Sequence, residues 1–407
     1  MSEQLVILVL VAVVALGFDF TNGFHDTGNA MATSIATGAL RPKIAVLLSA
    51  VLNLVGAFLS IEVALTVTNA VVNIQDSDGK PIPSLTADHG QALLMIILAG
   101  LIGGILWNLA TWLLGLPSSS SHALFGGLIG STVAALGWGG VNWTGDSTEL
   151  DGVLGKVVLP AVVSPVIAGF VAMTGTFLIF AITRRLGERL TGRGFRVGQI
   201  GTASLVSLAH GTNDAQKTMG VITLALIGYG SWHSTTSIPL WVKLACALSI
   251  ALGTYIGGWR VIRTMGKGLV EIEPRQGMAA EGSSAVVILA SSQLGMALST
   301  THVATGSILG SGVGRPGAQV RWGIAGRMVM AWVITLPMAG LVGAAMWWVG
   351  DVCGAGLLGA MVMVVVLASA STFMAARSRR SLVTPDNVND EWHGAPAATR
   401  RREPVAV

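Results

Sequence analysis

Charged residues are scarce in this 407-residue chain: Asp, Glu, Lys and Arg make up 11%, whereas hydrophobic residues make up 52%. Soluble domains carry about 25% charged residues, so the composition excludes an ordinary soluble protein. The mean hydropathy is +0.70, and the apolar runs are long enough to cross about 30 Å of hydrocarbon as helices. Because the runs lack the alternation of a β-barrel, we predict an all-α polytopic membrane protein.

Cysteine is also rare, and neither Cys246 nor Cys353 belongs to a CxxC or Cys/His pattern that would bind zinc. We interpret both as buried packing residues. The net charge of +4 comes from arginines in loops and the tail, which in a membrane protein indicate topology before nucleic-acid binding. No basic region precedes Leu5, so we predict that the first apolar run belongs to a mature helix and not to a cleaved signal.

Two polar motifs in the apolar chain each occur twice. Asp214 stands 188 residues after Asp26, and His302 stands 180 residues after His122, each within a matching stretch. The matched pairs are Gly23 with Gly211, Asp26 with Asp214, Met31 with Met219, Ser119 with Ser299, Ser121 with Thr301, and His122 with His302. Two motif pairs in the same order at similar offsets indicate an internal duplication.

Charge in the loops predicts how the two halves are oriented. The arginine-rich loop 184–196 favours the cytoplasm, which places the acidic loops 73–90 and 138–152 outside. The first half then begins outside and the second begins inside, as in inverted repeats. We predict about 10 to 12 transmembrane segments. The predicted units are residues 1–183 (first inverted repeat), 184–196 (basic cytoplasmic linker), 197–376 (second inverted repeat) and 377–407 (disordered basic tail).

Discontinuous helices are predicted where polar residues interrupt these runs. The first segment is too long for one straight span and carries two carboxylates, so we expect a break near Asn22-Gly23. A second break is expected at Pro117 and the serines that follow it. Residues 44–72 are predicted as one further crossing.

Asp26 and Asp214 lie in apolar surroundings, where a bare carboxylate costs several kcal/mol and needs a cation or a proton as partner. Carboxylate and amide oxygens suit a hard cation or a carboxyl group that cycles its proton. The alternative is a helix-capping or interhelical aspartate. The predicted coupling-ion residues are His25, Asp26, Asn29, Asn213 and Asp214.

The serine- and threonine-rich motifs precede small-residue helices, whose N-termini attract anions. The alternative is N-capping of ordinary helices. Lys217 either complements an anion or pairs with Asp214, and the two histidines that close the motifs either orient the turns or transfer protons. The predicted anion-binding residues are Ser118, Ser119, Ser120, Ser121, Ser299, Thr300, Thr301 and Lys217.

Residues 22–29, 209–217, 257–260 and 299–302 together resemble the inorganic phosphate transporter (PiT) family, in particular its bacterial low-affinity, proton-coupled branch. The resemblance implies symport of inorganic phosphate, either alone or as a neutral divalent-metal phosphate, by alternating access. It assigns ion coupling to Asp26, Asn29, Asn213 and Asp214, and phosphate to Ser119, Ser121, Ser299, Thr300 and Thr301.

Two positions depart from the sodium-coupled pattern of that family: His25 stands where the pattern has Asn, and Asn53 where it has Glu. Both changes favour H+ over Na+ as the co-transported ion. We therefore expect a multi-pass transporter of the inner cell membrane, without catalytic residues, resident metal or cofactor. Mg2+ accompanies the phosphate in the metal-phosphate alternative, and a homodimer is compatible with the sequence.

Two other functions remain open on the same residues. A Na+-coupled phosphate permease or a sulfate permease would use the same scaffold, because hydroxyl groups alone do not separate tetrahedral oxyanions. An intramembrane hydrolase would use a Ser/His pair or the two aspartates. We disfavour the hydrolase because a Ser next to a His in sequence rarely aligns as nucleophile and base.

Overall fold

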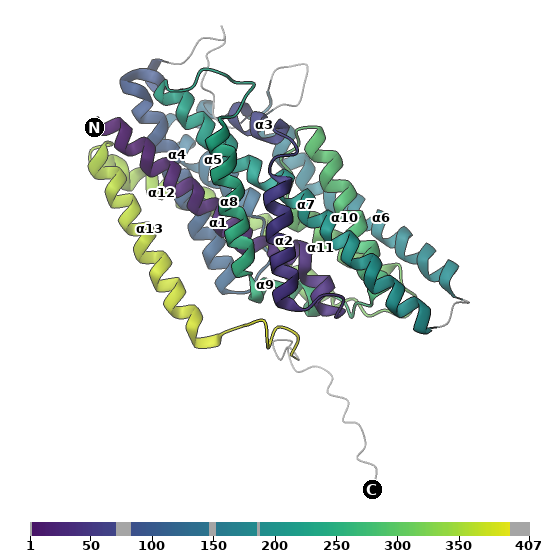
Figure 1. The fold of residues 1–407 in the computed structure, drawn as a ribbon. Helices are drawn as coiled ribbons and strands as arrows, with labels where there is room; N and C mark the ends of the chain where they lie inside the picture. Colours follow the sequence, from purple (N-terminus) through teal and green to yellow (C-terminus); the bar gives the residue numbers. More distant parts are fainter. Residues whose placement is uncertain (1, 71–82, 146–151, 185–187, 391–407) are drawn as a thin grey trace.

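The computed structural model describes residues 2–70, 83–145, 152–184 and 188–390, which form a bundle of helices with α13 along one side and α6 on the opposite side (Figure 1). The α-helices are α1 (Glu3–Ala36), α2 (Pro42–Gly56), α3 (Glu62–Ala70), α4 (Pro83–Leu113), α5 (Ser120–Leu136), α6 (Leu159–Thr183), α7 (Glu188–Tyr229), α8 (Leu240–Ile256), α9 (Trp259–Arg263), α10 (Pro274–Gln293), α11 (Thr300–Val313), α12 (Trp322–Val352) and α13 (Leu357–Ser378). Short 3₁₀ or π segments are η1 (Trp138–Gly140), η2 (Leu154–Val158), η3 (Thr264–Gly268) and η4 (Arg379–Ser381). The all-α prediction is confirmed.

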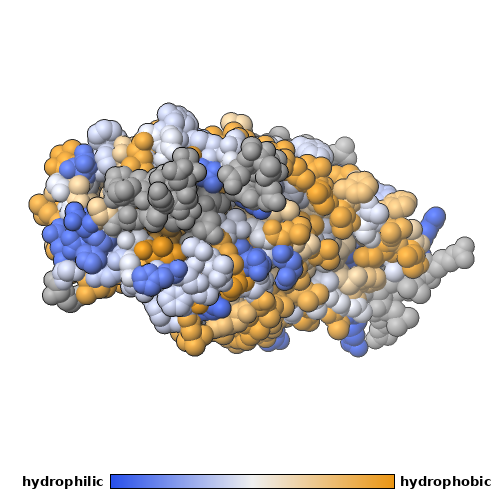
Figure 2. All heavy atoms as spheres, turned by 90° about the horizontal axis from the view of Figure 1, so that it is seen from above, coloured by the Kyte–Doolittle hydropathy of each residue, from blue (hydrophilic) through white to orange (hydrophobic). Residues whose placement is uncertain are grey.

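Five of these helices are long and apolar enough to cross a membrane, or up to six if the bent pair α8 and α9–η3 forms one span. Their outward side chains are apolar: Val162, Val166 and Phe170 of α6 are 65%, 68% and 64% exposed. Seen end-on, hydrophobic residues cover long stretches of the rim (Figure 2). Such a surface is stable in lipid and not in water, so the protein is a multi-pass membrane protein.

The helix break predicted at Pro117 is present between α4 and α5, and a matching break separates α10 from α11. Gly115 and Gly295 both have φ of +65°, a conformation that favours glycine. Ser119 and Ser299 each cap the following helix, and each side chain accepts a hydrogen bond from the backbone N–H three residues on, at 3.1 and 3.2 Å. The duplicated motif therefore forms the same turn twice.

The break predicted near Asn22-Gly23 is wrong, because α1 is a continuous helix of 34 residues. At about 1.5 Å per residue it is about 50 Å long, well beyond the hydrocarbon thickness. Glycine has a different purpose here: a Cβ on Gly23 would lie 2.2 Å from the carbonyl oxygen of Ile250. Its twin Gly211 meets Asn53 in the same way, also at 2.2 Å. Both glycines allow close helix packing.

Helices of one half of the chain pack on helices of the other half. α1 lies against α8, and α7 lies against α2. The crossing predicted for residues 44–72 is divided into α2 and α3, and α8 bends by 60° into α9 after Gly257. The two halves therefore share one core, which places α1 and α7 at its centre.

Two predicted boundaries differ from the structure. Most of the predicted linker 184–196 belongs to α7, which begins at Glu188. The predicted tail from residue 377 begins with ordered structure: Val388 is buried, and Arg263 donates hydrogen bonds to the backbone and side chain of Asn387. Residues 391–407 and parts of the predicted loops 73–90 and 138–152 lie outside the described residues.

We predict that Gly23→Ala destabilises the protein, because its Cβ would force α1 away from the backbone of α8. Overpacking of this kind typically costs about 1–3 kcal/mol. Gly17→Ala in the same helix is the matched control, since a Cβ there meets no atom within 4 Å. Thermal unfolding of the purified proteins in detergent measures both variants, and equal midpoints would contradict the packing role.

Candidate functional site

The predicted site residues converge where α1 and α7 meet the N-termini of α5 and α11. The carboxylates of Asp26 and Asp214 lie at the centre, and both are nearly fully buried. Their neighbours Asn29, Ser121 and Thr301 are at most 6% exposed. The site is therefore buried inside the protein in this structure.

The carboxylate of Asp26 accepts hydrogen bonds mainly from neutral groups. The Ser120 hydroxyl donates to Oδ1 at 2.9 Å, and the hydroxyls of Thr300 and Thr301 lie 3.5 Å from Oδ2. Nδ1 of His25 lies 2.6 Å from Oδ1. No Lys or Arg in the described part of the chain forms an ion pair with this carboxylate.

The carboxylate of Asp214 has the same hydroxyl partner and a cation in addition. The Thr300 hydroxyl donates to Oδ2 at 2.9 Å, and Lys217 forms a salt bridge with Oδ1. Nε2 of His210, one helical turn earlier, lies 2.9 Å from Oδ2. Burying this charge is stabilised by the ion pair, because an unpaired charge at this depth is costly.

The site consists of two half-sites, one around Asp26 of α1 and one around Asp214 of α7, and they repeat the same contacts. In each half-site, the first residue of the helix after the hairpin turn, Ser120 of α5 or Thr300 of α11, donates a hydroxyl hydrogen bond to the aspartate at 2.9 Å. Between halves, the side chain three residues after the aspartate binds the hydroxyl of the opposite turn: Asn29 donates to Thr301 at 3.0 Å, and Lys217 donates to Ser121 at 2.6 Å. The duplicated motifs thus form one composite site.

The two half-sites are close enough to share a ligand. Oxygen and nitrogen ligand atoms of Asp26, His210 and Asp214 lie within 4.8 Å of one another, an arrangement that can hold a cation. Thr300 also joins the halves, since its hydroxyl reaches both carboxylates, at 2.9 and 3.5 Å. The predicted coupling-ion carboxylates and the predicted anion-binding hydroxyl of Thr300 therefore lie in one cluster.

Several predicted residues have supporting contacts. Ser119 and Ser299 are N-caps, so the capping interpretation holds for their side chains. The Ser118 hydroxyl lies 2.7 Å from that of Thr111 and 3.5 Å from Nε2 of His25. Asn213 donates to Ser292 and to the carbonyl of Met296, and its Oδ1 is buried without a partner.

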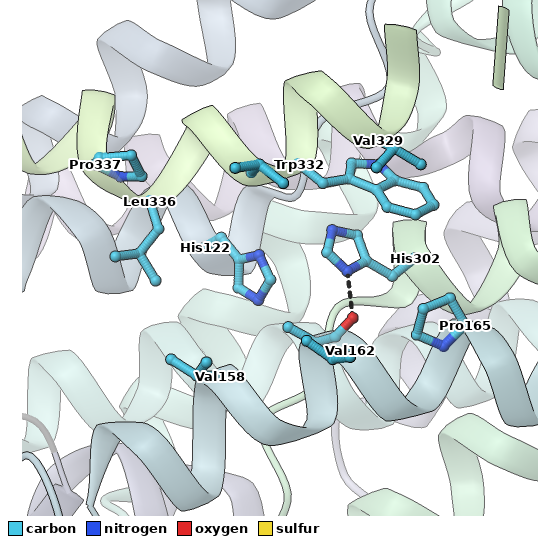
Figure 3. Close-up of a pocket in the computed structure, with 11 residues that line it drawn as sticks. His122, Val158, Val162, Pro165, His302, Val329, Trp332, Leu336 and Pro337 are labelled. Atoms are coloured by element: carbon cyan, nitrogen blue, oxygen red, sulfur yellow. Dashed lines mark hydrogen bonds between the residues drawn. The ribbon is translucent and has the colours of Figure 1, made fainter. Parts of the chain in front are cut away.

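The histidines that close the two motifs lie outside this cluster. The rings of His122 and His302 are 4.7 Å apart beside an apolar pocket of about 460 Å3, where His302 also stacks on Trp332 at 4.2 Å (Figure 3). Nδ1 of His302 lies 3.1 Å from the carbonyl oxygen of Ala161, the contact drawn as a dashed line. These contacts favour the role of orienting the turns over that of proton transfer to the carboxylates.

Comparison with known proteins decides the family. The sequence matches the Phosphate transporter family over residues 22–193 and 184–343. A relative from Mycobacterium tuberculosis described as a probable low-affinity inorganic phosphate transporter is 58% identical over 97% of this chain and 89% of its own length. The chain belongs to the phosphate transporter family. A Bacillus subtilis relative with the same description is 42% identical over 84% of this chain and 97% of its own length.

A solved structure supports the fold of this transporter. It is titled "The sodium-dependent phosphate transporter", has a TM-score of 0.72 with 23% identity, and covers 85% of this chain and 99% of its own. Family and relatives are transporters, so the prediction that the chain is not an enzyme is confirmed, as is a multi-pass location in the cell membrane.

Sequence reasoning missed two buried groups of the transporter. His210 contacts Asp214, and its spacing of four residues on one helix was the available signal. The second buried group is the carboxylate of Glu281 on α10. It is 2% exposed and accepts hydrogen bonds from Thr33 at 2.5 Å and Thr202 at 2.8 Å, together with Ser34 and Gln199. Its partners are distant in sequence, so no local pattern indicated them.

Thr300→Val should lower phosphate uptake at least about tenfold, because losing a hydrogen bond to a charged group costs about 1.5–3 kcal/mol. The size of the side chain is nearly unchanged. Thr132→Val is the control, since this buried hydroxyl donates to the backbone of Leu128, away from the site. Initial uptake rates in proteoliposomes give the comparison, and equal losses in both variants would remove Thr300 from the site.

Proposed function

We propose that the transporter is a symporter that moves inorganic phosphate together with H+. The observation that carries the proposal is the buried carboxylate of Asp26, which has no Lys or Arg partner among the described residues and is contacted by the hydroxyls of Ser120 and Thr301. A carboxylate at this depth is stable only with a proton or a cation. Binding of the coupling ion is thereby linked to the groups that would bind the anion.

The phosphate would rest on hydroxyls and helix ends. Ser120 and Thr300 begin α5 and α11, and Ser121 and Thr301 follow directly. The N-termini of these helices favour an anion through unpaired N–H groups and the helix dipole. Neutral donors hold an oxyanion less tightly than a cluster of arginines would, which suits a substrate that must also leave.

A change in the hydrogen-bond partner of Ser120 would couple the binding of phosphate to the binding of H+. The Ser120 hydroxyl donates to Asp26 at 2.9 Å, so it is not free to donate to phosphate. Protonation of Asp26 removes its charge and weakens this bond, which releases the hydroxyl toward the anion. Phosphate and proton therefore favour the same state of the site, the thermodynamic requirement for symport.

Two neighbours favour H+ over Na+ as the coupling ion. His25 is a titratable group 2.6 Å from Asp26, at a position where a sodium site would use an amide oxygen. Asn53 donates to Thr254 and lies beside His210, so it adds no carboxylate ligand. Because the site is buried, transport needs alternating opening to the two sides, for which the predicted inverted repeats would supply two symmetric arrangements.

The proposal predicts phosphate accumulation in proteoliposomes under an inward proton gradient, and little accumulation under a sodium gradient alone. Uptake with and without Mg2+ tests whether a metal-phosphate complex is the substrate. Sulfate added in excess should not compete with labelled phosphate, whereas arsenate should. Accumulation driven by a sodium gradient alone would show that Na+, and not H+, is the coupling ion. Full competition by sulfate would indicate a less selective oxyanion permease.

Substitution of Asp26 separates the coupling of transport to protons from the binding of phosphate. Asp26→Asn should abolish proton-driven accumulation while phosphate-for-phosphate exchange persists, because the amide resembles a permanently protonated carboxyl group. Asp351→Asn, at the exposed end of α12, is the matched control and should retain both activities. Accumulation at the wild-type level in Asp26→Asn would show that another group carries the proton.

A further inference from the structure

The two half-sites differ at one central position. Asn29 follows Asp26 by three residues, and Lys217 follows Asp214 by three residues. Both side chains bind a hydroxyl of the opposite turn, Thr301 and Ser121 respectively. Lys217 is 1% exposed, so its charge is fixed at the centre of the site. One half-site therefore contains a cation that is part of the chain, and the other does not.

The ammonium group of Lys217 is fully occupied by protein oxygens. It donates to the carboxylate of Asp214, to the hydroxyl of Ser121 at 2.6 Å and to the carbonyl oxygen of Leu298 at 2.9 Å. A lysine has three N–H donors, and this structure supplies three acceptors. No donor of Lys217 is left for a phosphate oxygen, which favours pairing with Asp214 over binding of the anion.

The oxygen atoms around Nζ are those of a cation site. A carboxylate, a hydroxyl and a backbone carbonyl are the ligands with which proteins bind hard cations. A lysine ammonium is a compact point charge. The covalent tether also holds the ammonium at a high effective concentration, so a free ion would compete poorly for these oxygens.

The other half-site retains ligands for an exchangeable ion. Oδ1 of Asn29 is buried without a hydrogen-bond partner among the described residues, whereas its amide nitrogen donates hydrogen bonds to the hydroxyls of Thr300 and Thr301. Among the described residues, the ionisable groups whose contacts with Asp26 are closest are His25, at 2.6 Å, and His210 and Asp214, whose ligand atoms lie within 4.8 Å; none of the three is a permanent cation, and the ammonium of Lys217 pairs with Asp214 instead. An unpaired amide oxygen beside this carboxylate is what an incoming proton donor or cation would bind.

We propose that the ammonium of Lys217 is a tethered cation that occupies the second of two equivalent cation positions, leaving one exchangeable coupling ion at Asp26 and Asn29. This inference rests on the proposed symport function and deepens it, because it sets how many cations each phosphate requires. The transporter would move one coupling ion fewer than a relative with two exchangeable positions.

Replacing the tethered cation with the residue of its twin tests the inference. Lys217→Asn gives both half-sites the same side chain and vacates the position among Asp214, Ser121 and Leu298. Equilibrium binding of radioactive Na+ to the purified full-length protein, at saturation and fixed pH, counts the cations bound. We expect Lys217→Asn to bind one more Na+ per chain than the wild type.

Three further variants make the count specific. Lys217→Arg keeps a tethered positive charge and should bind as many Na+ ions as the wild type. Lys243→Asn removes the same charge at the start of α8, away from the site, and should leave the count unchanged. Lys217→Gln gives the same comparison if Lys217→Asn does not elute as a folded protein in size-exclusion chromatography.

The outcome separates this inference from the proposed function. An unchanged Na+ count in both neutral variants overturns the tethered-cation role, and weaker phosphate binding without an added Na+ identifies Lys217 as an anion ligand instead. Phosphate uptake by the wild type is measured separately. A wild type that takes up no phosphate under any gradient refutes symport, yet the Na+ count still decides the role of Lys217.

Discussion

Two carboxylates buried in an apolar bundle impose the condition on which the rest of the structure depends. Asp26 and Asp214 are 1% and 0% exposed, at a depth where an uncompensated charge is costly. Hydroxyls of two hairpin turns, two histidines and one lysine surround them. Each of these groups offsets part of the free-energy cost of burying the carboxylates.

The helix breaks place the hydroxyl groups that bind these carboxylates at the centre of the bundle. A continuous helix has no free N–H groups in its interior, whereas α5 and α11 begin inside the protein and present N-terminal turns there. Gly115 and Gly295 reverse the chain, and Ser119 and Ser299 cap the new helices. The same local sequence produces both turns, so one solution for bringing polar backbone to membrane depth is used twice.

The sequence predicted features encoded by local patterns and failed where packing partners are distant. The α4–α5 break followed from Pro117 and the serines after it. The duplicated motifs singled out Asp26 and Asp214, which the structure brings together. Gly23 was misinterpreted as a helix break because a sequence does not show that the backbone of Ile250 lies against it. The environment of Glu281 was missed for the same reason, since its partners come from α1 and α7.

Duplication explains the symmetric geometry of the site, whereas one difference between the two copies, Asn29 against Lys217, makes the site asymmetric in charge. Equivalent contacts at 2.9 Å hold both aspartates to their turns, so the position three residues later faces equivalent surroundings in each half. At that position Asn29 donates an uncharged hydrogen bond, whereas the ammonium of Lys217 pairs with Asp214; under the proposed role of Lys217, only Asp26 then requires an external ion. If Lys217 has the proposed role, a single side chain in a duplicated framework changes the ion requirement of a transporter without altering its fold.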